Sequence, residues 1–227
     1  MNRIMKKIKK LLGNHPRVLY LITFLFNHLP FNNFIRNKKG NNICLMGIVK
    51  KSNITFYGKN NSVIVEEGAI LKNCTITIKG NNNKIIFKAK SYAKFADLVT
   101  EDNDNYIELG KNSSLAGKIH LACIEGTKII IGEDCLFSSE IIFRTGDSHA
   151  IIDSIGNRLN FSKDIFIGNH VWIGNRAIIT KGVNIPDNTI VGTGAIVTKS
   201  IERSNCTIAG VPAVIVKENV NWKHERC

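Results

Sequence analysis

The chain has 227 residues, of which 44% are hydrophobic and 22% charged, and a formal net charge of +13 at pH 7. This composition excludes a disordered or low-complexity chain and is sufficient for one sizeable domain. Residues 1–40 carry much of the charge, because they hold nine Lys and Arg and no Asp or Glu. Such a segment either favours an anionic partner or forms a solvated basic face, and the sequence leaves both open.

Residues 18–29 form an apolar run that Asn27 and His28 interrupt. A helix needs about 20 apolar residues to cross a bilayer, so this run does not span one. No small-residue cleavage site follows it, so we expect a cytoplasmic protein. We expect residues 1–40 to be a basic amphipathic helical segment that either caps the body or lies on the inner face of the membrane.

From Ile167 onward the chain is built of six-residue repeats. Their first positions hold only β-branched residues, namely Ile167, Ile173, Ile179, Ile185, Val191 and Val197. A helix would need apolar residues at spacings of about three to four, and a long strand would need alternation. A period of six instead indicates a short strand and a turn, three of which close one triangular coil with the first residue pointing inward. The sequence therefore predicts an all-β fold, a parallel β-helix.

The same organisation continues upstream with a looser register. Related segments begin at Asn61, Asn83 and Asn105 and recur every 22 residues, which is one coil plus a few loop residues. We expect coils over residues 41–208 and a C-terminal tail over 209–227. Residues 147–160 abandon the pattern and predict a loop extruded from the stack, where functional residues usually lie.

Four motifs, taken in order, resemble the hexapeptide-repeat acyltransferases, in the branch of maltose, galactoside and capsule or O-antigen sugar O-acetyltransferases. They are Asp-Ser-His at residues 147–149 and the segments 167–174, 191–199 and 209–213. The resemblance covers roughly residues 105–217 and implies a left-handed β-helix and a homotrimer. It also implies an acetyl-CoA co-substrate and O-acetylation of a sugar hydroxyl in a bacterial surface polysaccharide. No nucleic-acid partner is expected.

In that family a histidine at the start of the extruded loop is the general base, and His149 occupies the matching place. A sugar hydroxyl is a weak nucleophile, and an imidazole is suited to remove its proton at neutral pH. Transfer would be direct, without an acyl-enzyme, and backbone N–H groups would stabilise the oxyanion. Asp147 is a candidate to orient the imidazole, as is a nearby backbone carbonyl. His120 and His170 are not expected to be bases.

The resemblance implies that acyl-CoA lies in a groove between two subunits. Trp172, Gly174 and Asn175 would flank the pantetheine arm, backbone groups of Ala177, Thr193 and Ala195 would bond its amides, and Thr198, Lys199 and Lys217 would lie near the nucleotide and its phosphates. Val214 stands where the family often has Lys or Arg, so the sequence leaves open whether one of the phosphate contacts is made.

Three alternatives remain from the sequence. The same scaffold serves N-acetyltransferases that act on an amino sugar of a nucleotide-sugar intermediate. It also hosts a zinc-dependent carbonic anhydrase family, but the three histidines at 120, 149 and 170 lack the expected spacing, and the six cysteines fit no zinc ribbon, so we expect no metal. A non-catalytic β-helix scaffold is the third, and the extruded loop argues against it.

Overall fold

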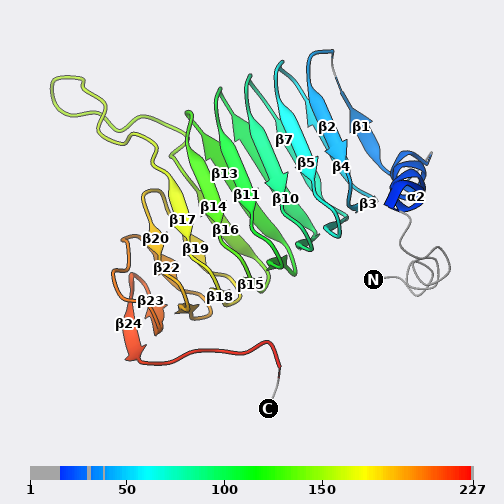
Figure 1. The fold of residues 1–227 in the computed structure, drawn as a ribbon. Helices are drawn as coiled ribbons and strands as arrows, with labels where there is room; N and C mark the ends of the chain where they lie inside the picture. Colours follow the sequence, from blue (N-terminus) through cyan, green and yellow to red (C-terminus); the bar gives the residue numbers. More distant parts are fainter. Residues whose placement is uncertain (1–15, 30–31, 38, 226–227) are drawn as a thin grey trace.

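The computed structural model describes residues 16–29, 32–37 and 39–225. It is a β-solenoid with one helix, α2 (Pro16–His28), at the N-terminal end and one long loop that projects from the coils (Figure 1). The predicted left-handed parallel β-helix is confirmed. The predicted helical segment includes α2, while residues 1–15 lie outside the described part of the chain.

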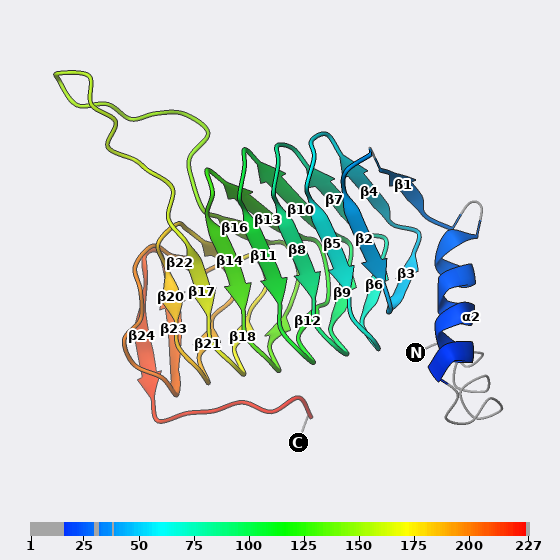
Figure 2. The same ribbon diagram turned by 45° about the horizontal axis from the view of Figure 1, so that its top comes forward.

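The chain runs through three sheets in turn, and each full turn makes one coil (Figure 2). Sheet A contains β1 (Phe34–Arg36), β4 (Asn53–Phe56), β7 (Thr75–Ile78), β10 (Ala96–Glu101), β13 (Ile119–Ile124), β16 (Ile141–Arg144), β19 (Ile178–Ile179) and β22 (Ile196–Val197). Sheet B contains β2 (Asn42–Leu45), β5 (Ser62–Val65), β8 (Lys84–Phe87), β11 (Tyr106–Leu109), β14 (Lys128–Ile131), β17 (Ile165–Ile167) and β20 (Asn184–Ile185). Sheet C contains β3 (Ile48–Lys50), β6 (Ile70–Lys72), β9 (Tyr92–Lys94), β12 (Ser114–Leu115), β15 (Leu136–Phe137), β18 (Trp172–Ile173), β21 (Ile190–Val191), β23 (Cys206–Gly210) and β24 (Ala213–Glu218).

The interior of the triangle is filled by the repeat positions that the sequence analysis identified. All six first positions from Ile167 to Val197 are buried. Aromatic side chains fill part of this interior, and the rings of Phe137 on β15 and Phe143 on β16 stack with their centroids 5.6 Å apart. This burial of apolar surface along the whole axis is the main term that stabilises the stack.

A buried ladder of asparagines holds one corner of the N-terminal coils. The amide oxygen of Asn61 accepts from the backbone N–H of Asn83 at 2.8 Å, and that of Asn83 accepts from the N–H of Asn105 at 2.9 Å. Each side chain thereby satisfies a backbone group that the turn leaves unpaired. The 22-residue recurrence of asparagine follows from this geometry.

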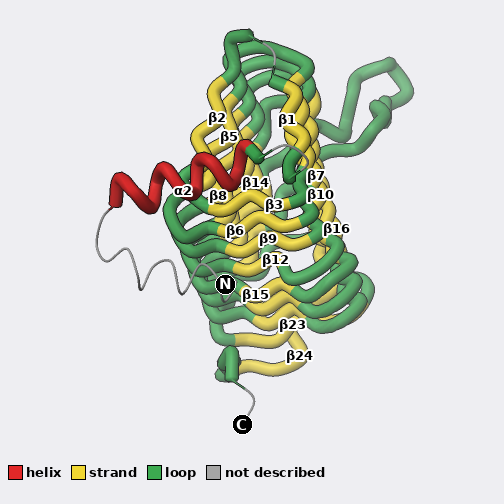
Figure 3. The backbone as a smooth tube through the Cα atoms, turned by 90° about the vertical axis from the view of Figure 1, so that its right-hand side faces the viewer, coloured by secondary structure: helices red, strands yellow, loops and turns green. Residues whose placement is uncertain are grey.

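Helix α2 covers the open N-terminal edge of sheet C (Figure 3). The buried side chain of Asn27 accepts from the N–H of Val49 at 2.9 Å and donates to the carbonyl of Gly47 at 2.8 Å. Its carboxamide therefore pairs with the edge of β3 as the peptide group of another strand would. Among the described residues, no helix has the length and apolarity needed to cross a membrane.

Strands β1 and β24 lie at the two ends of the solenoid. The first solenoid strand, β1, begins at Phe34 rather than at residue 41 and pairs with β4. At the other end β24 folds back on β23 as an antiparallel strand, within the expected tail of 209–227. Beyond β24 the chain runs back beneath the coils (Figure 1).

Candidate active site

The extruded loop leaves the stack between β16 of sheet A and β17 of sheet B, at residues 145–164. It projects well beyond the coils (Figure 2), and an antiparallel bridge between Ile152 and Arg158 closes its tip. Apolar side chains along it are exposed, namely Ile151, Ile152, Ile155, Leu159 and Phe161. Exposed apolar groups gathered on one segment are typical of a contact surface.

Asn160, which is 8% exposed, ties the two arms of the loop together at its base. Its amide nitrogen donates to the carboxylate of Asp147 and to the backbone carbonyl of His149, both at 2.8 Å. Its amide oxygen accepts from the N–H of Ile151 at 2.7 Å. One buried side chain therefore holds the carboxylate of Asp147 and two backbone groups, the carbonyl of His149 and the N–H of Ile151.

Lys181 also holds the foot of the loop, where it leaves the coils. Its ammonium donates to the carboxylate of Asp147 at 2.5 Å and to the backbone carbonyl of Asn160 at 3.0 Å. The hydrogen bonds from Lys181 and Asn160 lower the pKa of Asp147. Asp147 is one of the two candidates to orient the imidazole of His149, and in the described residues its carboxylate accepts from the side chains of Lys181 and Asn160.

A second ion pair fastens the outgoing arm. The guanidinium of Arg158 forms a fork with Glu125, with N–O distances of 2.7 and 3.0 Å, and the hydroxyl of Ser162 donates to the same carboxylate at 2.7 Å. These bonds from Arg158 and Ser162 lower the pKa of Glu125 to about 2. The loop is therefore anchored to the coil before it by a charge-assisted pair.

His149 itself is exposed near the root of the loop. Its backbone carbonyl is bound by Asn160, whereas no hydrogen bond engages its imidazole within the described part of the chain. An imidazole on a fixed backbone with both nitrogens free is competent to take a proton from a bound hydroxyl.

Six of the residues expected to contact acyl-CoA lie together at the corner between sheets C and A, in two successive coils. They are Trp172, Gly174, Asn175, Ala177, Thr193 and Ala195. Gly174 packs directly on the next coil, since a Cβ there would lie 2.7 Å from the backbone nitrogen of Thr193. The carbonyls of Ala177 and Ala195 already accept bonds from the N–H groups of Ile142 and Ile178. Trp172 stands exposed above this corner.

The remaining three residues lie elsewhere. Thr198 and Lys199 follow β22 and belong to the opposite corner, between sheets A and B. Lys217 lies on the antiparallel strand β24, opposite Thr207. All three side chains are exposed. The chain thus groups the residues expected near the pantetheine arm but not those expected near the nucleotide.

The two parts of the expected site, His149 and the Trp172 corner, lie at opposite ends of the strands of sheet A. The loop with His149 leaves from the corner after β16, whereas Trp172 and Thr193 border the corner before β19 and β22. The loop also points away from the coils rather than back over sheet A (Figures 1 and 2). One chain by itself therefore does not bring His149 to the Trp172 corner.

No protein-family model matches the chain. Two curated relatives match over short segments. The polysialic acid O-acetyltransferase of Escherichia coli O1:K1 / APEC is 32% identical over 90 residues, which is 30% of this chain and 29% of that protein. That of Neisseria meningitidis is 43% identical over 58 residues, 25% of this chain and 26% of that protein. These alignments thus span less than a third of either curated relative.

Two solved structures match over nearly the whole chain. The polySia-specific acetyltransferase NeuO superposes with a TM-score of 0.80 at 29% identity, over 86% of this chain and 90% of that one. The polysialic acid O-acetyltransferase OatWY superposes with a TM-score of 0.68 at 34% identity, over 87% of this chain and 90% of that one. The chain belongs to the hexapeptide-repeat acyltransferases. The family and the enzyme class predicted from the four motifs are confirmed.

This acyltransferase has a cluster of two histidines and an aspartate where the C-terminal tail crosses the coils. His170 lies at a turn with a φ of +53°, stacks on Trp222 at 4.2 Å between ring centroids, and faces Asp134 with Nδ1 at 2.8 Å. His224 approaches the same carboxylate at 3.2 Å. Ligand atoms of Asp134, His170 and His224 lie within 4.8 Å of one another, which is close enough for one cation to contact all three.

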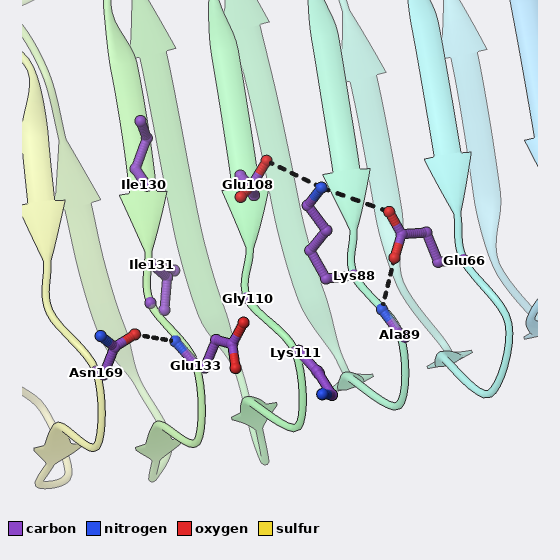
Figure 4. Close-up of a pocket in the computed structure, with 11 residues that line it drawn as sticks. Glu66, Lys88, Ala89, Glu108, Gly110, Lys111, Ile130, Ile131, Glu133 and Asn169 are labelled. Atoms are coloured by element: carbon purple, nitrogen blue, oxygen red, sulfur yellow. Dashed lines mark hydrogen bonds and ion pairs between the residues drawn. The ribbon is translucent and has the colours of Figure 1, made fainter.

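His120 of the acyltransferase faces Asp97 of the neighbouring strand at 2.9 Å, in a shallow groove of about 360 Å³ on sheet A. A second groove, of about 370 Å³, lies along sheet B and carries a row of alternating charges (Figure 4). There the ammonium of Lys88 lies 3.5 Å from Glu66 and 3.8 Å from Glu108. Neither groove contains a residue of the predicted site.

The residues that sequence reasoning missed are those that hold the loop: Asn160, Lys181, Arg158 and Glu125. Asn160 lies at the end of the segment that breaks the repeat. Polar residues at both ends of such a segment indicate side chains that hold the two arms of the loop together. Lys181 and Glu125 lie in other coils, 34 and 33 residues from their partners, and no local pattern marks them.

Proposed function

We propose that this acyltransferase moves an acetyl group from acetyl-CoA to a hydroxyl of polysialic acid. The support for the acceptor is the near full-length similarity to OatWY and NeuO. The support for the chemistry is the free imidazole of His149 on a backbone that Asn160 fixes.

In this mechanism His149 removes the proton of the sugar hydroxyl as its oxygen attacks the thioester carbonyl. A C–O bond forms, and the tetrahedral oxyanion is stabilised by backbone N–H groups at the Thr193 corner. The C–S bond then breaks, and His149 returns its proton to the departing sulfur. The site residues are Trp172, Gly174, Asn175, Ala177, Thr193 and Ala195 for the pantetheine arm, with Thr198, Lys199 and Lys217 toward the nucleotide.

The test is to incubate the purified protein with acetyl-CoA and polysialic acid and to characterise the product. We expect free CoA to be released only with polymer present, and the polymer to carry acetyl groups that mild alkali removes, as it does esters. A neutral polysaccharide of similar length should release none. Alkali-stable acetyl groups on an amino sugar would instead identify an N-acetyltransferase.

We further propose that the active unit is a homotrimer in which each loop reaches a neighbouring chain. Two observations support this: the opposite corners of His149 and Trp172, and the exposed apolar side chains of the loop, of which Ile155 is 82% exposed. A cyclic trimer repeats one loop-to-corner contact three times and completes every site.

Helix α2 supports a peripheral membrane contact. It buries the polar residues Thr23 and Asn27 against the solenoid and exposes Val18, Leu21 and Leu25. Spacings of three and four residues put these apolar side chains on one face. The basic composition of residues 1–40 complements an anionic surface, so we propose that this face lies on the inner leaflet.

This predicts that replacing Leu21 and Leu25 with serine lowers the affinity for anionic lipid vesicles by about tenfold or more, because both side chains lose their apolar contact. Vesicle co-sedimentation measures this. Val214→Ser with Val216→Ser, which changes exposed apolar residues on β24, is the matched control and should sediment like the wild type. Equal sedimentation of all three proteins contradicts the proposal. Truncation is a poorer test, because it also removes Asn27.

A further inference from the structure

Three lysines stack on the outer face of sheet C. Lys50 of β3 is in register with Lys72 of β6, and Lys72 is in register with Lys94 of β9. Neighbouring strands lie about 4.8 Å apart, so the three side chains form a row on consecutive coils, here called the lysine ladder. All three side chains are half-buried. Within the described ranges, none has a carboxylate within 4.0 Å.

Two other lysines of this solenoid have carboxylate partners in neighbouring coils. Lys88 lies between Glu66 and Glu108, and Lys79 pairs with Glu101 of the next coil at 2.6 Å. Like charges directly opposite on neighbouring strands repel each other. The three lysines of the ladder are in no such ion pair within the described ranges, so an anion bound along the coil axis would offset the repulsion between their ammonium groups.

The ladder leads toward the expected acetyl-transfer site. In the following coils the position of Lys94 is occupied by small residues, Ala116, Ser138 and Gly174, while Trp172 lies in register with Leu136 on the same face. Figure 3 faces this sheet, with β3, β6, β9, β12 and β15 following one another along it. On the outer face of sheet C the positive row thus continues into a column of small side chains, with Leu136 and Trp172 beside it.

We infer that the lysine ladder binds the negatively charged acceptor chain and leads it to the Trp172 corner. This inference rests on the proposed function and deepens it, since it gives the acceptor a second binding region on the N-terminal coils. A polymer with one carboxylate in each sugar presents a row of charges to this row of ammonium groups. Such a contact is electrostatic and weakens steeply with salt.

The experiment compares two triple variants that remove the same charge. The first is Lys50→Gln, Lys72→Gln and Lys94→Gln. The matched control is Lys59→Gln, Lys84→Gln and Lys128→Gln, which changes exposed lysines off sheet C. We expect the ladder variant to raise the KM for polysialic acid by about tenfold and to flatten its salt dependence, with kcat and the KM for acetyl-CoA within about twofold of wild type. The control should keep the wild-type KM.

Binding provides a readout that does not depend on catalysis. We expect the ladder variant to elute from immobilised polysialic acid at lower salt than the wild type and the control. Equal elution and equal KM for both triple variants would overturn the inference, as would a loss confined to anionic vesicle binding. If the wild type binds the polymer but transfers no acetyl to it, the proposed function fails while the ladder stands. Thermal unfolding checks that each variant is folded.

Discussion

His149→Ala is expected to lower kcat for acetyl transfer by about a thousandfold, with little change in the KM for acetyl-CoA. The loss follows because the hydroxyl then attacks the thioester without a base to accept its proton. The backbone bonds from Asn160 involve the carbonyl of residue 149, which alanine keeps, so the loop should stay in place. Steady-state kinetics of CoA release measures both constants.

His120→Ala is the matched control for this prediction. His120 lines the groove on sheet A and pairs with Asp97, and its removal should leave kcat within about twofold of wild type. A His149→Ala protein with full activity contradicts the mechanism. A large loss of kcat in the His120 variant, together with an active His149 variant, would identify His120 on sheet A as the general base.

The second large effect concerns the subunit boundary. His149→Ala removes the general base. Thr193→Trp places a large side chain in the corner between sheets C and A, and because Thr193 is exposed, this change leaves the core intact. Each variant alone is expected to be nearly inactive. Co-expressed with two different tags and purified through both, they form trimers that each contain one intact loop facing one intact corner. We therefore expect about a third of the wild-type activity to return, as a cyclic trimer requires.

Two outcomes test this prediction. A mixture of two differently tagged His149→Ala chains must remain inactive, which is the control for trace wild-type enzyme. If the purified hybrid is no more active than its parents, each site is built from one chain, and the loop must fold back over sheet A. The molar mass of the hybrid in solution shows directly whether it is a trimer.

The fold was predictable because its rule is local and repeated. Each coil needs an inward β-branched or small residue at the same place, so Ile167 and its successors reveal the register without any tertiary information. The recurring Asn61, Asn83 and Asn105 likewise mark a corner in which one side chain serves the next coil. Because the coils stack, residues that are one period apart in the sequence lie next to each other in space.

The details of the site were less predictable because they depend on the one segment without a period. Asp147 lies two residues from His149 in sequence, yet its carboxylate bonds to Asn160 and Lys181. The conformation of an extruded loop decides such partners, and no spacing encodes it. Trp222 is a further example, since it stacks on His170 from the far end of the chain.

The closure of the N-terminal edge by Asn27 bears on how this enzyme avoids fibrous self-assembly. A parallel solenoid is open at both ends, and a bare end presents the same row of peptide groups that the next coil uses. At one end the carboxamide of Asn27 occupies that row on sheet C, and at the other β24 reverses the strand direction. The two ends of sheet C therefore do not match, so copies of this chain are disfavoured from stacking end to end and remain free to associate side by side.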